Sequence, residues 1–406
     1  MNGDALSRLA TGRKHDLFIE DVECCRKQIA DAVNGKRVLI IGGAGSIGSS
    51  TVLQIAHFIP RSLHVVDQNE NNLAELVRDI RSQKEEFPVS DFKALPIDFG
   101  SPVMRRLVKE QPSYDFVLNF AALKHVRSEK DTLSLLQMLD TNIIKQARLL
   151  EWLAEKSSPL RYFCVSTDKA ANPVNMMGAS KRLMEHVIFS SEAYEGAGAV
   201  ITSARFANVA FSDGSLLYSW LRRMEKRQPV VVPRKTKRFF ISLREAGQLC
   251  VIAGTCAPDR TIVIPRFHPE KDLRELFDIA TAFLRFQGFD PHECHSEEEA
   301  KASIDADLAC GRYPLLLTPL DTSGEKPYEE FIGKGERGEE IGLPNLLAIY
   351  FRGFKDGRVK AFLSSIEQFL EHANVEMSKD HIIQLIKSVV PEFQHNETGK
   401  SLDNQM

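Results

Sequence analysis

The sequence lacks the features that mark several large classes of protein. Its formal net charge is only −3 over 406 residues, so it has no basic surplus of the kind that nucleic-acid-binding proteins carry. It has no run of about 18 uncharged apolar residues, as a membrane-spanning helix needs, and its first residues contain no apolar stretch typical of a secretory signal. We therefore expect a cytoplasmic protein that has no membrane span and does not bind nucleic acid.

Cysteine is also scarce. The seven cysteines are odd in number and irregularly spaced, which indicates free thiols in a reducing compartment rather than a disulfide framework. The segment HECH places His292, Cys294 and His295 close together, but it lies in a polar stretch and no second cluster follows at zinc-like spacing. From the sequence we therefore predict no metal site.

Internal repeats are absent, and the apolar residues that are present, 43% of the chain, follow an alternating pattern. Short runs rich in Val, Ile, Leu and Phe alternate with helical segments. The runs are residues 37–41, 63–66, 116–120, 162–165 and 200–204. This is the pattern of βαβ units around a buried parallel sheet. We predict a fold of the α/β class, a Rossmann-type doubly wound parallel sheet.

The strongest local motif is VLIIGGAGSIGSS, residues 38–50. Gly42, Gly45 and Gly48 follow a predicted strand and open a predicted helix, so the backbone around Ser46 and Ile47 can receive a pyrophosphate without a Cβ in the way. A glycine pattern alone fits an ordinary tight turn equally well. Its place after a buried strand, with an acidic residue downstream, favours dinucleotide binding.

Two aspartates are candidates for the adenosine half of such a cofactor. Asp67 ends the second predicted strand, where a carboxylate accepts hydrogen bonds from the ribose hydroxyls and repels a 2′-phosphate, so NAD is favoured over NADP. Asp98, in LPIDFG after the third strand, is placed to hold the adenine amino group, although an ordinary loop aspartate also fits there.

Six motifs in a fixed order carry a family resemblance. The glycine turn is followed by NFAALKHV, STDKA, MGASKR, RFANV and SGEKPYEE. This order resembles the nucleotide-sugar 4,6-dehydratases of the extended short-chain dehydrogenase/reductase family, and most of all the branch that acts on UDP-N-acetylglucosamine in bacterial polysaccharide synthesis. The resemblance covers roughly residues 17–335 and implies bound NAD and a nucleotide-sugar substrate. We also expect a homo-oligomer.

The resemblance implies roles for two neighbouring residues. A 4,6-dehydratase oxidises C4 of the sugar by hydride transfer to NAD, removes the C5 proton, loses the C6 hydroxyl as water and returns the hydride to C6. By resemblance, Asp168 is the acid that protonates the leaving hydroxyl and Lys169 is the base that removes the C5 proton. The alternative is that the two residues form an ordinary solvated ion pair.

Met177 departs from the pattern of the wider family, in which a tyrosine takes the proton from the hydroxyl being oxidised and Lys181 assists it. A thioether cannot accept that proton at neutral pH. Our hypothesis is that Thr167, a water or Lys181 relays the proton while Met177 packs against the nicotinamide or the sugar. The rival hypothesis is a dead site in a dinucleotide-binding regulatory protein, against which the joint presence of Asp168, Lys169 and Lys181 argues.

Other residues match family positions around the two ligands. By resemblance, Asn208 and Arg238 contact the nucleotide diphosphate, to which a planar guanidinium can form paired hydrogen bonds. The loop after the fourth predicted strand supplies cofactor and substrate candidates: Ala121, Ala122, Lys124 and His125. A plain polar loop is the alternative for the last two.

The segment RFANVAFSDGS departs from the family's more usual RFGNV, with Ala207 for glycine and Phe211 in the loop that follows. A reshaped pocket leaves two further enzymes open, a dehydratase of another nucleotide sugar and a 4-epimerase. An epimerase oxidises C4 but needs no acid–base pair for C5 and C6, so Asp168 and Lys169 favour the dehydratase. Because relatives with methionine tend to retain the C5 configuration, we expect retention.

These assignments predict four regions. A helix over 17–35, ending in Asn-Gly, indicates an N-terminal helical extension. A C-terminal extension carries helices near 358–371 and 378–390 and a polar tail of about twelve residues that we expect to be disordered. The regions are a helical extension at 1–35, an NAD-binding domain at 36–255 with substrate-contacting segments from about 205, a substrate-binding region at 256–335, and the extension and tail at 336–406.

Overall fold

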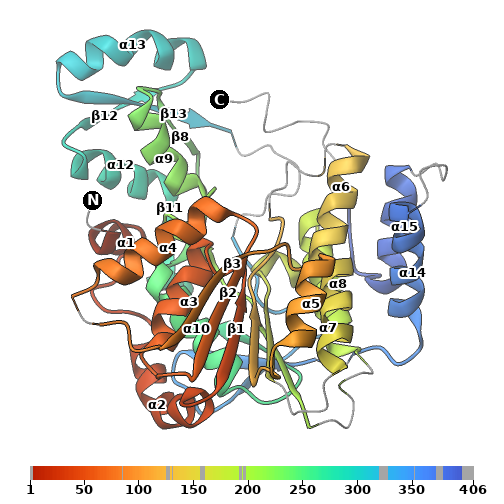
Figure 1. The fold of residues 1–406 in the computed structure, drawn as a ribbon. Helices are drawn as coiled ribbons and strands as arrows, with labels where there is room; N and C mark the ends of the chain where they lie inside the picture. Colours follow the sequence, from red (N-terminus) through yellow and green to blue (C-terminus); the bar gives the residue numbers. More distant parts are fainter. Residues whose placement is uncertain are drawn as a thin grey trace.

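The computed structural model describes residues 3–84, 86–124, 129, 131–155, 161–191, 194, 198–319, 328–351, 353–371 and 378–395. In this described part, nine strands form a central sheet (Figure 1). They are β1 (Arg37–Ile41), β2 (Ser62–Asp67), β3 (Asp91–Pro96), β4 (Phe116–Asn119), β5 (Arg161–Val165), β6 (Val200–Ala204), β10 (Thr261–Pro265), β14 (Gly338–Glu340) and β15 (Leu346–Tyr350).

The sheet has the strand order β14-β15-β10-β6-β5-β4-β1-β2-β3. The strands from β3 to β10 pair in parallel, and β15 pairs antiparallel with both β10 and β14. The order reverses between β1 and β4, which is the switch point where doubly wound sheets bind ligands beyond the carboxyl ends of their strands. The predicted Rossmann-type fold is confirmed.

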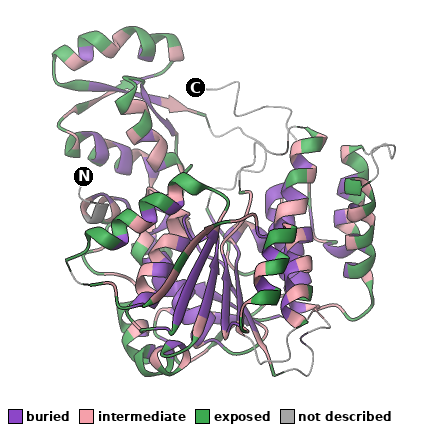
Figure 2. Ribbon diagram, in the orientation of Figure 1, coloured by how far each residue is buried: buried purple, intermediate pink, exposed green. Residues whose placement is uncertain are grey.

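Helices cover both faces of the sheet, and Figure 2 shows the strands buried between them. One face carries α2 (Ile19–Val33), α3 (Ser46–Ala56), α4 (Glu70–Ser82) and α10 (Leu243–Thr255). The other carries α5 (Pro102–Glu110), α6 (Thr132–Leu139), the π-helix η2 (Asp140–Ile144), α7 (Lys145–Ala154), α8 (Met176–Phe189), α14 (Arg358–Glu371) and α15 (Lys379–Val389).

The two apolar cores explain why the strands read as unbroken apolar runs. Along β1, Val38 and Ile40 enter one core cluster, and Leu39 and Ile41 enter the other. Successive side chains point to opposite faces of a strand, so a sheet covered on both faces needs apolar residues at every position.

Much of the remaining described chain forms a small lobe above one end of the sheet (Figure 1). A parallel sheet of order β12-β13-β8 lies in it, and α1 (Gly3–Thr11) joins its apolar core. The small lobe consists of α9 (Leu216–Glu225), β8 (Val230–Pro233), α12 (Leu276–Phe286), β12 (Asp290–Cys294), α13 (Glu297–Ala309) and β13 (Arg312–Thr318). The remaining elements are short: η3 (Asp168–Ala170), β7 (Asn208–Val209), β9 (Lys237–Ile241), α11 (Pro269–Asp272) and β11 (Leu273–Glu275), of which β11, β9 and β7 form a second three-stranded sheet.

The helices expected over 17–35, 358–371 and 378–390 are present as α2, α14 and α15. The central sheet, however, extends past the boundary expected at residue 255, because β10, β14 and β15 all belong to it. β10 continues the parallel βαβ pattern, whereas β15 and β14 join the sheet through antiparallel pairing, which that pattern does not predict. The tail from residue 396 lies outside the described residues, and no helix within them is long and apolar enough to cross a membrane.

Candidate active site

The turn between β1 and α3 is built from glycines for steric reasons. Gly42 has φ +68°, and a Cβ there would lie 2.6 Å from the backbone nitrogen of Ala121. A Cβ on Gly48 would lie 2.3 Å from the carbonyl oxygen of Gly42. The turn therefore packs closely against the loop after β4 and against its own helix, and these two positions need glycine.

The N-terminus of α3 has the character of an anion site. Gly45 is its N-cap and provides no side-chain cap, and the nearest atom to a Cβ built on Gly45 would be the carbonyl oxygen of Gly42, at 3.5 Å. Ser46 and Ile47 form the start of the helix. Backbone N–H groups and the positive end of the helix dipole are thus available to a phosphate group.

Asp67 lies directly beside this turn, at the end of β2. Its Oδ2 accepts a hydrogen bond from the backbone N–H of Ala44 at 3.1 Å, and its Oδ1 accepts one from Asn69 at 2.9 Å. These bonds fix the carboxylate next to the glycine turn. Each oxygen keeps a further lone pair for a ribose hydroxyl.

Asp98 is held by a cation that the sequence reading did not single out. Its Oδ2 accepts a hydrogen bond from Lys145 Nζ at 2.6 Å, and its Oδ1 accepts one from the backbone N–H of Gly100 at 2.9 Å. Burial acts to raise the pKa of Asp98, but these hydrogen bonds outweigh it and lower the pKa. The predicted contact with an adenine amino group stays a prediction.

The loop after β4, which contains Ala121 and Ala122, is held by a buried asparagine. Asn142 Oδ1 accepts from the backbone N–H of Leu123 at 2.8 Å, and its Nδ2 donates to Ser180 Oγ at 3.0 Å. Asn142 lies in η2, the π-helical segment between α6 and α7, and such segments often occur at functional sites. Asn142 follows Asp140 and Thr141 and precedes Lys145, so no feature of the sequence distinguished it for this role.

Lys124 and the loop before α9 meet above the glycine turn. Lys124 Nζ donates to the carbonyl oxygen of Asp213 at 2.7 Å. Ser46 Oγ donates to Asp213 Oδ2 at 2.9 Å and accepts from the Asp213 backbone N–H at 2.9 Å. Asp213 therefore links the two expected binding regions, a role that the sequence analysis missed. His125 lies outside the described residues.

The segment STDKA brings its polar side chains together at the carboxyl end of β5. Thr167 Oγ1 donates to Asp168 Oδ1 at 2.6 Å, and Lys169 Nζ lies 3.4 Å from both carboxylate oxygens of Asp168. Asp168 is buried, whereas the Lys169 side chain is 40% exposed. Ser166 points elsewhere and donates to the buried Glu185 at 2.6 Å.

Lys181 and Met177 lie on the first turns of α8, beside this cluster. Lys181 Nζ donates to the carbonyl oxygen of Val165 at 2.8 Å, and burial lowers the pKa of its ammonium group. Met177 is buried, and its backbone N–H donates to Glu129 at 3.0 Å. Lys181 is therefore fixed against the last residue of β5, while Met177 offers no group that can move a proton.

Asn208 and Arg238 meet at a carboxylate that the sequence analysis did not single out. Glu329 Oε1 accepts from Asn208 Nδ2 and lies 3.2 Å from Arg238 Nε, and its Oε2 accepts from the backbone N–H of Phe239 at 3.1 Å. Burial and the charge of Asp168 raise the pKa of Glu329. The predicted substrate residues thus adjoin the Asp168 cluster. The rest of the SGEKPYEE motif before Tyr328 lies outside the described residues.

A buried ion network lies beneath the site. Arg205, which is fully buried, donates to Glu185 Oε1 and Oε2 at 2.8 and 2.6 Å and to Glu336 Oε2 at 2.6 Å. Burial acts to raise the pKa of Glu336, but hydrogen bonds and charge from Arg205 lower it to about 2. The arginine of the RFANV motif therefore joins β6, α8 and the segment after Tyr328, which rigidifies the floor of the site.

Comparison with known protein families identifies the family of the chain. A family model described as polysaccharide biosynthesis protein matches residues 38–350. The chain belongs to this family. An uncharacterised membrane protein of Methanocaldococcus jannaschii is 30% identical to it over 327 residues, 80% of this chain and 88% of that protein.

Two proteins with more specific names are also similar to it. The probable polysaccharide biosynthesis protein EpsC of Bacillus subtilis is 28% identical over 90% of this chain, which spans only 57% of the length of EpsC. The UDP-N-acetylglucosamine 4,6-dehydratase (inverting) of Campylobacter jejuni is 27% identical over 52% of this chain and 61% of that protein. Among solved structures, Pen from Bacillus thuringiensis shares the fold, with a TM-score of 0.62 at 21% identity over 82% of this chain and 98% of that chain.

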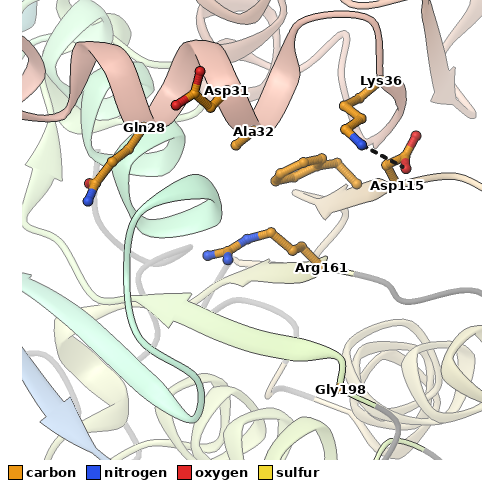
Figure 3. Close-up of a pocket in the computed structure, with 8 residues that line it drawn as sticks. Gln28, Asp31, Ala32, Lys36, Asp115, Arg161 and Gly198 are labelled. Carbon is orange, nitrogen blue, oxygen red and sulfur yellow. Dashed lines mark ion pairs between the residues drawn. The ribbon is translucent and has the colours of Figure 1, made fainter.

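A pocket of about 450 Å³, whose lining residues are drawn in Figure 3, lies at the amino ends of β4 and β5. It includes the first residues of β4 and β5, and Arg161 in it donates to the carbonyl oxygens of Gly254 and Ala257. In doubly wound sheets ligands bind at the carboxyl ends of the strands. We therefore do not assign this pocket to the active site.

Proposed function

We propose that the protein is an NAD-dependent dehydratase that converts UDP-N-acetylglucosamine to UDP-4-keto-6-deoxy-N-acetylhexosamine, with the C5 configuration retained. The observation that carries this proposal is the grouping of Thr167, Asp168 and Lys169 at the carboxyl end of β5. Membership of a polysaccharide biosynthesis family and the name of the Campylobacter relative support the substrate class.

The residues of the glycine turn fit NAD. The N-terminus of α3 offers backbone donors for the pyrophosphate, Gly45 leaves space there, and Asp67 offers carboxylate oxygens to the adenosine ribose. When bound, NAD supplies the acceptor for the C4 hydride and the same hydride for C6. The proton transfers are then left to the side chains of this chain.

The hydrogen bond between Thr167 and Asp168 provides a route for the C4 proton that needs no tyrosine. Thr167 Oγ1 takes the proton of the C4 hydroxyl and passes its own proton to Asp168, 2.6 Å away. Asp168, now protonated, is the acid that the C6 hydroxyl requires in order to leave as water. One carboxyl group thereby receives the C4 proton and delivers it to C6, so it returns to its starting state.

Lys169 and Lys181 have separate tasks in this scheme. Lys169, as an uncharged amine, removes the C5 proton and later returns a proton to C5. Its side chain is 40% exposed, and its Nζ lies 3.4 Å from both carboxylate oxygens of Asp168. Lys181, fixed to Val165, places a positive charge where the C4 oxygen becomes an alkoxide.

The direct test is incubation of the purified protein with UDP-N-acetylglucosamine, followed by mass spectrometry and NMR. We expect a product lighter by one water, with solvent deuterium at C5 when the reaction is run in D₂O. A 4-epimerase would give a product of unchanged mass. Turnover to such an isomer, or an unchanged substrate with every nucleotide sugar tried, would overturn the proposal.

The first prediction concerns the cofactor. We expect the protein to purify with NAD bound and to turn over many substrate molecules without consuming it, because the hydride taken from C4 returns to C6. Release of the nucleotide by denaturation and its assay by chromatography measures this. Purification with NADP, or a requirement for one added NAD per turnover, would contradict it.

The second prediction concerns Glu329, which orders Asn208 and Arg238. The Glu329→Gln variant keeps the shape but loses the charge that holds Arg238, and hydrogen bonds to charged groups are worth about 1.5–3 kcal/mol. We expect KM for the nucleotide sugar to rise about tenfold, the factor that corresponds to about 1.4 kcal/mol, with NAD content unchanged. Glu330→Gln, on the exposed neighbour, is the matched control. Equal effects of both variants would remove the role given to Glu329.

A further inference from the structure

One cluster outside the proposed active site combines the three kinds of donor that bind zinc-like metals. His292, Cys294 and Glu299 each place one potential ligand atom within 4.8 Å of the others. His292 and Cys294 belong to β12, and Glu299 lies in the first turn of α13, in the outer part of the small lobe (Figure 1). The fold thus brings the Glu299 carboxylate close to His292 and Cys294 of the HECH segment.

The imidazole of His292 is oriented by a buried carboxylate. Its Nδ1 lies 2.6 Å from Asp307 Oδ2, and Asp307 is 1% exposed and lies 3.0 Å from Arg312. A histidine that binds a metal through one nitrogen commonly donates its other ring N–H to a carboxylate, which fixes the ring and its tautomer. With Nδ1 held by Asp307, Nε2 is the nitrogen left for a metal.

The other two donors are held in different ways. Cys294 is fully buried at the end of β12, and its thiol lies 3.5 Å from the carbonyl oxygen of His292 and 4.0 Å from Ser303 Oγ. Glu299 is exposed, and its Oε2 accepts from the backbone N–H of His295 at 2.7 Å, which leaves Oε1 for a ligand. The sulfur is therefore fixed, while the carboxylate can adjust.

We propose that His292, Cys294 and Glu299 bind one divalent cation of the zinc class. Metal–ligand bonds of about 2.0–2.3 Å place the ligand atoms of a tetrahedral site roughly 3.5 Å apart. The ligand atoms lie within 4.8 Å of one another, so binding requires a small contraction, for which the exposed Glu299 side chain is free to adjust. A thiolate and a carboxylate balance the charge of the cation, and Arg312 balances Asp307.

The cluster lies apart from the proposed active site. It joins the last residue of β12 to the first turn of α13, whereas the residues assigned to catalysis lie at the carboxyl end of the central sheet. The sequence analysis argued against a metal because no second cluster follows HECH. The third donor, Glu299, instead comes from the first turn of α13, which is rich in glutamate. Glutamate is favourable at a helix start without any metal, so the sequence alone could not identify Glu299 as a ligand.

The test is cobalt binding by the full-length protein after treatment with chelator, under reducing conditions without oxygen. We expect one cobalt per chain, with the thiolate-to-cobalt charge-transfer absorbance and the visible bands of a tetrahedral ion, and competition by zinc. Cys294→Ser should abolish the charge-transfer band. Asp307→Asn should weaken binding by about 10- to 100-fold, as is usual when a carboxylate partner of a ligand is lost.

Cys310→Ser is the matched control, since Cys310 is an exposed cysteine directly after α13. It should bind cobalt like the parent. Circular dichroism of each metal-free variant establishes that it is folded, and Glu299→Gln gives a surface change that should weaken binding without disturbing the core. Absence of the charge-transfer band in the folded parent protein, or its persistence in Cys294→Ser, would overturn the proposal.

Discussion

Replacement of Lys169 by alanine is expected to stop water loss while leaving oxidation at C4 in place. The amine is the proposed base for C5, and general-base catalysis contributes about 10²- to 10⁴-fold, so dehydration should fall by at least about two orders of magnitude. Thr167 and Asp168 keep their 2.6 Å hydrogen bond in this variant, so the C4 proton can still leave. Reduced cofactor should therefore accumulate on addition of substrate, visible by its absorbance.

Asp168→Asn should behave differently. An amide cannot take the proton that Thr167 passes on, so this variant should lose both C4 oxidation and dehydration while still purifying with NAD. Lys360→Ala, on an exposed residue of α14, is the control for a lost surface lysine. If Lys169→Ala and Asp168→Asn both lost NAD, or if both lost only dehydration, the assignment of two proton-transfer steps to Asp168 would be wrong.

The fold could be predicted from the sequence because its main determinant is local. β1, β2, β4, β5 and β6 are short, mostly apolar runs that are almost fully buried, whereas the edge strand β3 is only partly buried. The glycine turn follows β1 directly and opens α3, as a strand–turn–helix unit requires. The hydrophobic pattern does not predict the pairing of strands that are distant from one another in the sequence. β15 joins the sheet antiparallel to β10, and its short apolar run is no different from any other.

The candidate site, too, could be predicted only where its residues are close together in the sequence. Residues in contiguous motifs, such as Thr167, Asp168 and Lys169, lie together because neighbours at a strand end must. Glu329 and Asp213 were missed because their partners are far away in the chain: Glu329 pairs with Asn208 and Arg238, and Asp213 with Ser46. Such contacts are fixed only when the central sheet and the small lobe are folded together.

Substitutions of Lys181 and Met177 are expected to have very different effects on activity. Lys181→Met removes the charge that is fixed at Val165 and the 2.8 Å hydrogen bond to that carbonyl oxygen, so we expect activity to fall by two orders of magnitude or more. Met177→Leu, similar in volume, should keep most of the activity, because volume-conserving apolar swaps usually cost less than about 1.5 kcal/mol. Steady-state rates of dehydration and bound NAD are the measurements.

The proposed proton relay through Thr167 can be tested with the same measurements. Thr167→Val removes the hydroxyl that lies 2.6 Å from Asp168 and should abolish C4 oxidation, whereas Thr167→Ser restores the hydroxyl and should recover most of it. Met177→Tyr offers a phenol in a buried position that now holds a flexible thioether, so activity should be kept or modestly reduced. If Met177→Tyr instead raised activity manyfold, and Thr167→Val retained it, the C4 proton would leave by another route and the parent site would be a degenerate one.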